Sequence, residues 1–502
     1  MEHPARLTTL IAMMSKETVS ALSRVPSDRA RSIICRMKSF IPRVIVPAVV
    51  AFAICCFALR VGAQNGWRPL FDGRTLQGWY PCNGTARFSV EDGAIVGRTV
   101  VGSPNSFLCH QETFGDFILE FEAKIESEMN SGVQIRSISD PAIKGGRTHG
   151  YQVEIDPSER AWTGGLYDEA RRGWLHTLAG QEAARKAIRK GDWNRFRVEA
   201  IGTSIRTWLN GVECANVVDD LTSRGLIALQ VHSIGSDQSK AGQTIRFRNI
   251  RVLTTDLERN RTPDNGTTPQ FNYIPNTVTA REAREGWKLL WDGKTTSGWR
   301  GAKLDTFPAT GWQIGGGVLT VLAAEGKESA AGGDIVTIDQ YGNFDLIVEF
   351  MITQGANSGI KYFVDTTLNK GEGSSIGCEF QILDDAVHPD AKAGVNGNRK
   401  LAGLYDLIPP QNVRFNGVGE WNRAEISVRG SHVEHWLNGF KTVEYERGTQ
   451  MWRALVDHSK YTVWPAFGEA PKGHILLQDH GNRVSFRSIK IKVLPASAPL
   501  SD

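Results

Sequence analysis

Short alternations of apolar and polar residues recur along most of the chain, and they predict β-strands joined by tight turns. In FRVEAIGTSIRTWLNGVE (196–213), two alternating runs meet at Gly-Thr-Ser, and the second run ends at Asn-Gly. Asn-Gly readily supplies the positive φ that a tight hairpin turn requires. Roughly a dozen such runs in each half of the chain, with almost no helical period, favour a two-sheet sandwich of jelly-roll type. We therefore expect an all-β protein.

The pattern also repeats on a larger scale, because five motifs occur twice in the same order. This predicts a tandem duplication. The pairs are GWRPLFDGRTLQGW (66–79) with GWKLLWDGKTTSGW (286–299), FGDFILEFEAKIESEMNSGVQIR (114–136) with YGNFDLIVEFMITQGANSGIKYF (341–363), GGLYD (164–168) with AGLYD (402–406), GDWNRFRVEAIGTSIRTWLNG (191–211) with GEWNRAEISVRGSHVEHWLNG (419–439), and GLIALQVHS (225–233) with GHILLQDHG (473–481).

Three boundaries follow from these patterns. We expect a first sandwich over residues 64–254 and a second over 284–496. Residues 255–283 between them are polar and rich in Pro, Asn and Thr. They show neither the helical nor the strand period of apolar residues, which indicates a linker.

The N-terminus has a different pattern. RVIVPAVVAFAICCFALRVGA (43–63) combines a basic flank, an apolar run and small residues at its end. This is the pattern of a secretory signal, and the run is short for a membrane span. We expect residues 1–63 to be an N-terminal extension with a signal peptide at about 37–63, with an uncleaved membrane anchor as the alternative.

The net charge of the chain changes sign when residues 1–63 are left out. The whole chain has 502 residues and a net charge of +4, but residues 1–63 hold nine of its 58 Lys and Arg and three of its 54 Asp and Glu, which leaves −2 for the remainder. No arginine-rich stripe or nucleic-acid motif appears. The composition therefore argues against nucleic acid as a partner, and membrane contact is expected only through an uncleaved signal segment.

Four cysteines lie outside the leader: Cys82, Cys109, Cys214 and Cys378. Their spacing matches neither a disulfide framework nor a zinc site. We expect small buried residues, with a Cys82–Cys109 bridge as the alternative in an oxidising compartment.

Two strands with exchanged polar residues are the first candidate for a site. GYQVEID (150–156) carries Gln152 and Glu154, and GCEFQILDD (377–385) carries Glu379 and Gln381 in the opposite order. Residues two apart on a strand project from the same face, so each pair offers a carboxylate and an amide together. Both groups bind sugar hydroxyls, which suggests that each strand lines a polyol-binding cleft.

A second strand in each copy adds an amide and an imidazole. Gln230 and His232 in LQVH correspond to Gln478 and His480 in LQDH. A single histidine is more often a satisfied buried side chain, but the recurrence of the pair favours a site. The GLYD motifs contribute Tyr167 with Asp168, and Tyr405 with Asp406. A tyrosine can stack on a sugar, whereas an aspartate at this junction is equally typical of a turn.

Cationic and metal-binding candidates are fewer. Arg136 and Lys361 follow the NSG motifs and could stabilise an anion. The run HVEH (432–435) is a poor ligand set, because His432 and Glu434 share one strand face while His435 lies on the other. Glu379 with His480 and a nearby aspartate could hold a divalent ion, so a divalent metal is the one cofactor that we consider.

Taken in order, LFDGRTLQGW, NSGI, CEFQILDD, AGLYDLIPP, GEWN, VEHWLNG, LQDHG and FRSIKI resemble the secreted bacterial family of 3-keto-disaccharide hydrolase domains, also described as 3-keto-glucoside lyase and hydratase domains. The second copy matches over nearly its whole length. The first resembles another branch of the family, through YQVEIDPSERAWTGGLYDEARRGWL (151–175). The resemblance implies a concanavalin-like jelly roll, a keto-glycoside or oligosaccharide substrate, and a periplasmic or extracellular location.

The resemblance also implies chemistry, because a ketone at sugar carbon 3 acidifies the proton on carbon 2. A base, an enolate stabiliser and an acid for the leaving group then suffice. His480 or Glu379 would be the base, a bound metal or Lys361 the stabiliser, and Asp406 an orienting group or ligand. In the first copy, the expected counterparts of these residues are His232, Glu154, Arg136 and Asp168.

Two other functions compete with this enzymatic one. Sandwich folds of this shape also occur in lectins, so a non-catalytic carbohydrate-binding protein is the main alternative. It predicts saccharide binding without turnover. A structural or adhesion protein of the cell envelope is a third possibility and predicts no saturable sugar binding.

Overall fold

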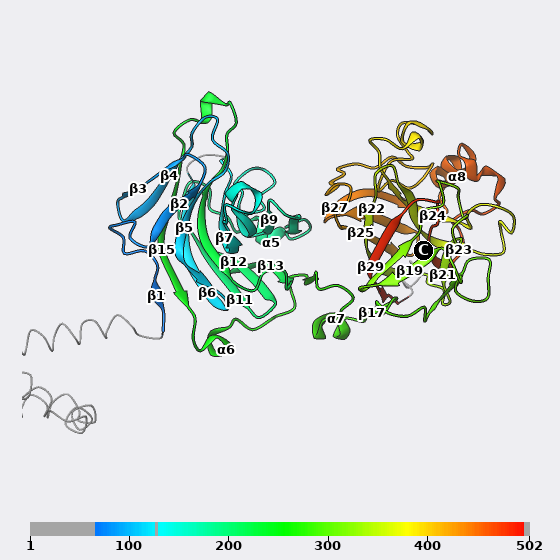
Figure 1. Cartoon of the computed structure of the whole chain (residues 1–502), viewed down its shortest axis with the longest axis horizontal. Helices are drawn as coiled ribbons and strands as arrows, with labels where there is room; N and C mark the ends of the chain where they lie inside the picture. Colours follow the sequence, from blue (N-terminus) through cyan, green and yellow to red (C-terminus); the bar gives the residue numbers. More distant parts are fainter. Residues whose placement is uncertain (1–65, 126–128, 496–502) are drawn as a thin grey trace, which may run out of the picture. The chain divides into compact units, whose positions relative to one another are not determined.

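The computed structural model describes residues 66–125 and 129–495, and these form two β-sandwiches joined by a linker (Figure 1). The predicted all-β, tandem jelly-roll fold is confirmed. The predicted signal segment at about 37–63 lies outside the described residues. Within the described residues, no helix is long and apolar enough to cross a membrane.

The first sandwich consists of a nine-stranded and a seven-stranded sheet. The larger sheet has the order β16-β13-β12-β11-β6-β15-β4-β3, with β1 paired to β15, and comprises β1 Arg68–Pro69, β3 Arg87–Glu91, β4 Ala94–Arg98, β6 Phe117–Ile125, β11 Asn194–Ile201, β12 Ser204–Leu209, β13 Val212–Val218, β15 Thr244–Leu253 and β16 Phe271–Asn272. The smaller sheet has the order β10-β9-β8-β7-β14-β5-β2 and comprises β2 Trp79–Asn83, β5 Ser106–Phe114, β7 Ser131–Ile138, β8 His149–Ile155, β9 Leu166–Glu169, β10 Gly173–His176 and β14 Gly225–Val231.

The second sandwich consists of an eight-stranded and a five-stranded sheet. The larger has the order β19-β20-β29-β22-β25-β26-β27, with β17 paired to β29, and comprises β17 Trp287–Leu289, β19 Trp312–Gly315, β20 Val318–Val321, β22 Phe344–Ile352, β25 Asn422–Arg429, β26 His432–Leu437, β27 Phe440–Glu446 and β29 Val484–Val493. The smaller has the order β18-β21-β28-β23-β24 and comprises β18 Trp299–Gly301, β21 Ile335–Thr337, β23 Asn357–Asp365, β24 Ile376–Leu383 and β28 His474–Leu477.

Helices are short and lie between strands. They are η1 Lys144–Gly146, α5 Glu182–Arg185, η2 Gln238–Lys240, α6 Leu257–Asn260, α7 Ala280–Arg284, η3 Pro389–Lys392, α8 Gln450–Asp457 and η4 Lys460–Val463.

The two copies have the same strand order. Strands β8-β7-β14-β5-β2 of the first smaller sheet correspond to β24-β23-β28-β21-β18 of the second, and β13-β12-β11-β6-β15-β4-β3 correspond to β27-β26-β25-β22-β29-β20-β19. Each sandwich has its own buried apolar cluster between its two sheets. The duplication seen in the sequence is therefore also a duplication of topology.

The predicted Asn-Gly hairpins hold this topology in register. Asn210 and Gly211 have φ values of 50° and 88° between β12 and β13, and Asn438 and Gly439 have values of 50° and 80° between β26 and β27. Asparagine and glycine tolerate this left-handed region best, so the same dipeptide closes the same hairpin in both copies.

The linker contains ordered elements. Strand β16 adds a parallel edge to β13 of the first sandwich. Helix α7 begins with a capping box between Thr279 and Glu282, and Glu282 also pairs with Lys490 of the second sandwich. Residues 255–283 are thus bonded to folded elements on either side.

Cys82 and Cys109 form a disulfide between the neighbouring strands β2 and β5. The expectation that these two are merely small buried residues was therefore wrong, and the alternative is correct. Cys214 and Cys378 are free and buried, as predicted.

Candidate functional site

The smaller sheet of each sandwich has one face in the core and an outer face that carries polar residues beside a small apolar cluster. On β8, Tyr151, Val153 and Ile155 belong to the buried apolar cluster, so Gln152 and Glu154 project from the opposite face. On β24, Cys378, Phe380 and Ile382 are in the core, and Glu379 and Gln381 project outward. The shared face predicted for each pair follows from this alternation.

Strand register shows which residues are equivalent across the two copies. In the first, Gln230, Gly132 and Glu154 lie in one row across β14, β7 and β8. In the second, Gln478, Gly359 and Gln381 lie in the corresponding row. The next row is Gln134, Gln152 and Tyr167 in the first copy and Lys361, Glu379 and Tyr405 in the second.

The glycine in each row makes room for a neighbouring side chain. A Cβ on Gly132 would lie 2.4 Å from Gln152 Cδ, and one on Gly359 would lie 2.1 Å from Glu379 Oε1. These distances are far inside van der Waals contact. Glycine is therefore required where the polar side chains of the adjacent strand cross the sheet surface.

Register also corrects one predicted pairing. The counterpart of Lys361 is Gln134, whereas Arg136 corresponds to Phe363. Both of these residues have positive φ, at 46° and 53°, where the pairing of the strand is irregular. Arg136 donates to Gly115 O, Gly202 O and Asp116 Oδ1, each at 2.8 Å, and is 1% exposed. The irregularity thus directs Arg136 into the hairpin turns at the end of the sandwich, away from the polar row.

A cavity of about 700 Å³ covers the polar face of the first sandwich. Predicted residues that line it are Gln152, Glu154, Tyr167 and His232, together with Asn130, Arg147, Arg160, Glu169 and Trp174, which the sequence did not single out. We call this cavity the first cleft. Its two arginines already pair with carboxylates, Arg147 with Glu169 at 2.9 Å and Arg160 with Asp156 at 2.7 Å.

Glu154 is the ionisable group in the floor of the first cleft. Its carboxylate accepts hydrogen bonds from Asn130 Nδ2 and, at 2.9 Å, from Gln152 Nε2. Burial raises the pKa of Glu154 to about 7, because these amides only partly replace the water that the carboxylate loses. Beside it, Gln230 is fully buried, and both polar atoms of its amide lack a partner among the described residues. An unpaired buried amide is costly, which makes Gln230 unusual among the polar residues of this face.

The corresponding polar surface of the second sandwich is organised around Glu379, and we call it the second cleft only because it is equivalent by strand register to the first. Lys361 Nζ lies 3.7 Å from Glu379 Oε2, and both residues are buried. Lys361 also donates to Ser374 Oγ and, at 3.2 Å, to Ser375 O. Burial raises the pKa of Glu379, and the positive charges of Lys361 and Lys460 oppose that rise. The charges of two ammonium groups therefore act on this carboxylate, whereas Arg160, the cation that acts on Glu154, is already paired with Asp156.

Three further polar atoms of the second cleft have no partner in the described parts of the chain: Gln381 Oε1, Gln478 Oε1 and His480 Nδ1. Gln478 Nε2 donates to Glu328 Oε1 at 3.3 Å, and Glu328 lines an adjoining cavity of about 380 Å³. The hydroxyl groups of a polyol could form hydrogen bonds with these unpaired atoms.

Asp479, the residue between Gln478 and His480, has a structural role. Its Oδ2 accepts from the backbone N–H groups of Ala331, Gly332 and Gly333 at 2.9–3.1 Å. It thereby fixes the loop that lines the adjoining cavity. The first copy has the core residue Val231 at this position.

The two GLYD aspartates do not share the polar face. Asp168 is fully buried and accepts from Arg171 Nε at 2.7 Å and Arg172 Nε at 2.6 Å. Asp406 accepts from Arg399 Nε at 2.7 Å and from Lys460 N at 2.8 Å. Of the neighbouring tyrosines, Tyr167 lines the first cleft, and Tyr405 donates its hydroxyl to Asp390 Oδ2 at 2.7 Å. The aspartates thus anchor loops beside the clefts and do not project into them.

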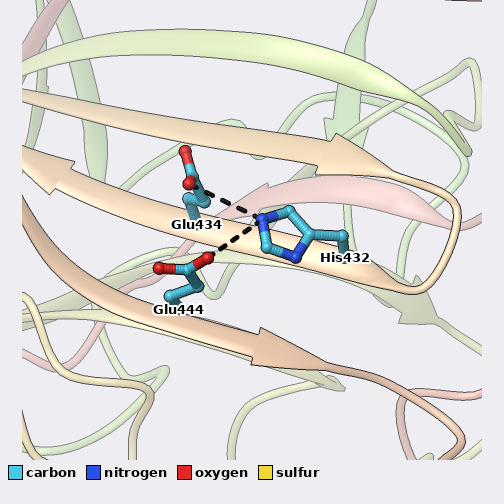
Figure 2. A group of neighbouring side chains, drawn as sticks. All are labelled: His432, Glu434 and Glu444. Carbon is cyan, nitrogen blue, oxygen red and sulfur yellow. Dashed lines mark ion pairs between the residues drawn. The ribbon is translucent and has the colours of Figure 1, made fainter. Parts of the chain in front are cut away.

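His432, Glu434 and Glu444 form a separate cluster on β26 and β27 of the larger sheet (Figure 2). His432 Nε2 lies 3.5 Å from an oxygen of each glutamate. Lys441 Nζ, however, already pairs with both carboxylates, and His435 is buried on the other face. The cluster is a surface ion-pair network, consistent with the poor ligand set that the HVEH spacing indicated.

Comparison with known proteins assigns relatives to both copies. The family model described as a 3-keto-alpha-glucoside-1,2-lyase-like domain matches residues 66–253 and 286–492. A 3-keto-disaccharide hydrolase of Bacteroides thetaiotaomicron is 38% identical over 232 residues, covering 42% of this chain and 79% of that protein.

Solved structures also align with parts of the chain. A candidate glycosyl hydrolase of Parabacteroides distasonis aligns with 31% identity and a TM-score of 0.40, over 44% of this chain and 100% of that one. A carbohydrate binding module of Bacillus subtilis aligns with 18% identity and a TM-score of 0.25, over 35% of this chain and 95% of that one.

Proposed function

Because the chain belongs to the family of 3-keto-alpha-glucoside-1,2-lyase-like domains, we propose that it is a carbohydrate hydrolase that cleaves 3-keto-glycosides by elimination and hydration. The observation that carries the proposal is the buried carboxylate beside unpaired amide atoms on the outer face of each smaller sheet, joined in the second copy by the unpaired Nδ1 of His480. The similarity to a 3-keto-disaccharide hydrolase supports the same substrate class.

The elimination needs a base, for which Glu379 is the candidate in the second cleft. Its carboxylate takes the proton from carbon 2, and the electrons of that C–H bond form the enolate with the carbon 3 ketone. When the enolate collapses, the bond between carbon 1 and the glycosidic oxygen breaks. The leaving oxygen takes a proton, for which the unpaired Nδ1 of His480 is the candidate donor.

Hydration completes the cleavage. Water adds to the product glycal, with the hydroxyl on carbon 1 and the proton on carbon 2, which gives the 3-keto sugar. The protonated Glu379 can return the carbon 2 proton. In the first cleft, Glu154 and His232 are the corresponding candidates, with Gln152, Gln230 and Tyr167 as polyol contacts.

A divalent metal fits the second cleft poorly. Glu379 and His480 are its candidate ligands, but Lys361 Nζ lies 3.7 Å from the carboxylate, and the charge of Lys460 also acts on it. A dication would meet repulsion from both ammonium groups. We therefore assign no step to a metal, and we expect activity to persist in the presence of a chelator.

Export from the cytoplasm is part of the proposal. The predicted signal segment and the Cys82–Cys109 disulfide both support an oxidising compartment such as the periplasm or the extracellular space.

The experiment compares a 3-keto-glucoside, such as 3-keto-trehalose, with its unoxidised parent, using the chain from Gln64 onward. The proposal predicts sugar release from the keto substrate alone, because the parent has no acidified proton at carbon 2. Binding of both compounds without release from either would contradict it, and would favour the non-catalytic carbohydrate-binding function.

A further inference from the structure

One segment of the second sandwich has no counterpart in the first. Strand β13 ends at Val218 and β14 begins at Gly225, whereas β27 ends at Glu446 and β28 begins only at His474. The longer connection, residues 447–473, contains α8 and η4. The repeat itself therefore gives no indication of what this segment does.

The segment is firmly packed. Trp452, Tyr461 and Phe467 are each no more than 3% exposed and belong to the buried cluster of the second sandwich. The rings of Tyr461 and Phe467 stack with a centroid distance of 4.0 Å. A loop with this much buried aromatic surface holds its exposed residues in fixed positions.

Lys460 is the exposed residue that the segment brings to the second cleft. Its backbone N–H donates to Asp406 Oδ2 at 2.8 Å, and its Nζ lies 4.2 Å from the ring centroid of Tyr405. Tyr405 is bonded through its backbone N–H to Glu379 O at 3.1 Å, in the row that contains Lys361. The ammonium of Lys460 thus lies over the ring next to the candidate base.

The two lysines near Glu379 differ in what their ammonium groups can still bind. Lys361 Nζ donates hydrogen bonds to Ser374 and Ser375 and forms an ion pair with Glu379 at 3.7 Å, so most of its capacity is already used within the protein. Among the described residues, Lys460 Nζ makes no ion pair or hydrogen bond and contacts only aromatic faces, those of Tyr405 and Tyr461. Its donors therefore remain available to a ligand.

The first cleft has an aromatic ring beside its tyrosine, Trp174, and the cation over that ring, Arg160 at 5.1 Å, already pairs with Asp156. Trp174 packs against Tyr167 with a centroid distance of 5.3 Å and lines the cavity. An indole beside a tyrosine suits the apolar face of a sugar ring. It offers no full positive charge to a developing oxyanion.

We propose that Lys460 is a substrate-contacting residue of the second cleft, whose ammonium binds the oxygen on carbon 3 as that oxygen becomes an enolate. This inference rests on the proposed function, and it moves the stabilising role from Lys361, which is bonded to two serines and paired with Glu379, to Lys460. It also distinguishes the two clefts, since Arg160, the cation that acts on Glu154 in the first, already pairs with Asp156.

The test uses the full chain from Gln64, with Glu154→Gln to silence the first cleft. In this background we compare Lys460→Met, Lys460→Arg and, as a control on the same segment, the exposed Lys472→Met. Loss of an electrostatic stabiliser costs about 100-fold in kcat. We expect this loss in Lys460→Met with KM little changed, partial recovery in Lys460→Arg, and no change in Lys472→Met. A kcat in Lys460→Met within threefold of its background would overturn the inference.

A binding measurement separates this inference from the proposed function. Kojate, the anion of a planar hydroxypyranone, imitates the enolate and needs no turnover. Lys460→Met should weaken kojate binding at least about tenfold relative to the background, as expected for a lost charge-assisted hydrogen bond. Turnover in the background chain with unchanged kojate binding in Lys460→Met would contradict the role of Lys460 alone. Weakened kojate binding without any turnover in the unaltered chain would contradict the proposed function instead.

Discussion

Lys361 and Glu379 form a buried pair in the second sandwich, with Nζ 3.7 Å from Oε2. Their counterparts in the first sandwich, Gln134 and Gln152, are two neutral amides joined by a 2.7 Å hydrogen bond. The exchange of Glu and Gln between the copies therefore accompanies the exchange of a lysine on the neighbouring strand. One carboxylate lies beside a lysine, whereas the other, Glu154, accepts its hydrogen bonds from the amides of Asn130 and Gln152.

The first prediction concerns the pH profile of the second cleft. Lys361→Met removes the largest influence that opposes the burial-induced rise in the pKa of Glu379. The base will then ionise only at higher pH, and we expect the acidic limb of the kcat/KM profile to move to higher pH. Gln134→Met in the first sandwich is the matched control and should leave the limb in place. With Glu154→Gln silencing the first cleft in every variant, an unmoved limb in Lys361→Met would show that Glu379 is not the base.

The second prediction concerns the stability of the first sandwich. Burial raises the pKa of Glu154 from 4.5 to about 7, so the folded state holds its proton more tightly than the unfolded state does. The resulting contribution to stability is complete below pH 4.5, is lost as the pH rises to about 7, and stays lost above that value. At alkaline pH this difference amounts to about 3 kcal/mol.

Glu154→Gln should therefore raise the unfolding midpoint at pH 8 and leave it nearly unchanged at pH 4. Thermal unfolding at the two pH values measures the difference. Equal shifts at both values would mean that ionisation of Glu154 is not the cause.

The third prediction separates anchoring from catalysis. Asp168 is fully buried between Arg171 and Arg172, and Asp168→Asn leaves these arginines without their shared carboxylate. Breaking a buried ion pair costs about 3–5 kcal/mol. We expect a lowered unfolding midpoint, with turnover by the folded protein within a few-fold of normal. A protein that keeps its midpoint but loses turnover would place Asp168 in the reaction.

The fourth prediction concerns the disulfide. Cys82 and Cys109 are 27 residues apart, and a cross-link over a loop of this length contributes about 3–4 kcal/mol. Replacing both cysteines by alanine should lower the unfolding midpoint and make it insensitive to reductant. If reductant lowers the midpoint of the double variant as much as that of the unaltered chain, the effect does not arise from this bond.

The strand pattern and the duplication were predictable from sequence because both depend on local periodicity and on self-similarity. The shared faces of Gln152 with Glu154 and of Glu379 with Gln381 follow from the same alternation. Arg136 was paired wrongly with Lys361, since strand register and an irregular residue of positive φ decide where a side chain points. Aligning NSGVQ with NSGIK would have identified Gln134.

Lys460 was missed for another reason. The segment that carries it has no partner in the repeat, and its approach to Tyr405 depends on tertiary packing. The bonds of Asp168 and Asp406 to arginines likewise depend on tertiary packing. The sequence alone therefore could not decide whether these aspartates are turn residues or site residues. The disulfide could not be decided from spacing, because pairing between β2 and β5 requires the sheet order.

The most direct measurement follows sugar release from a 3-keto-glucoside by the chain from Gln64 and by the double variant Glu154→Gln, Glu379→Gln. The unaltered chain should release sugar, and the double variant, with its fold verified by circular dichroism, should lose at least about 100-fold in kcat/KM, as is typical when a general base is removed. Undiminished release by the double variant would contradict the assignment of both clefts. Absence of release by the unaltered chain would contradict the proposed activity itself.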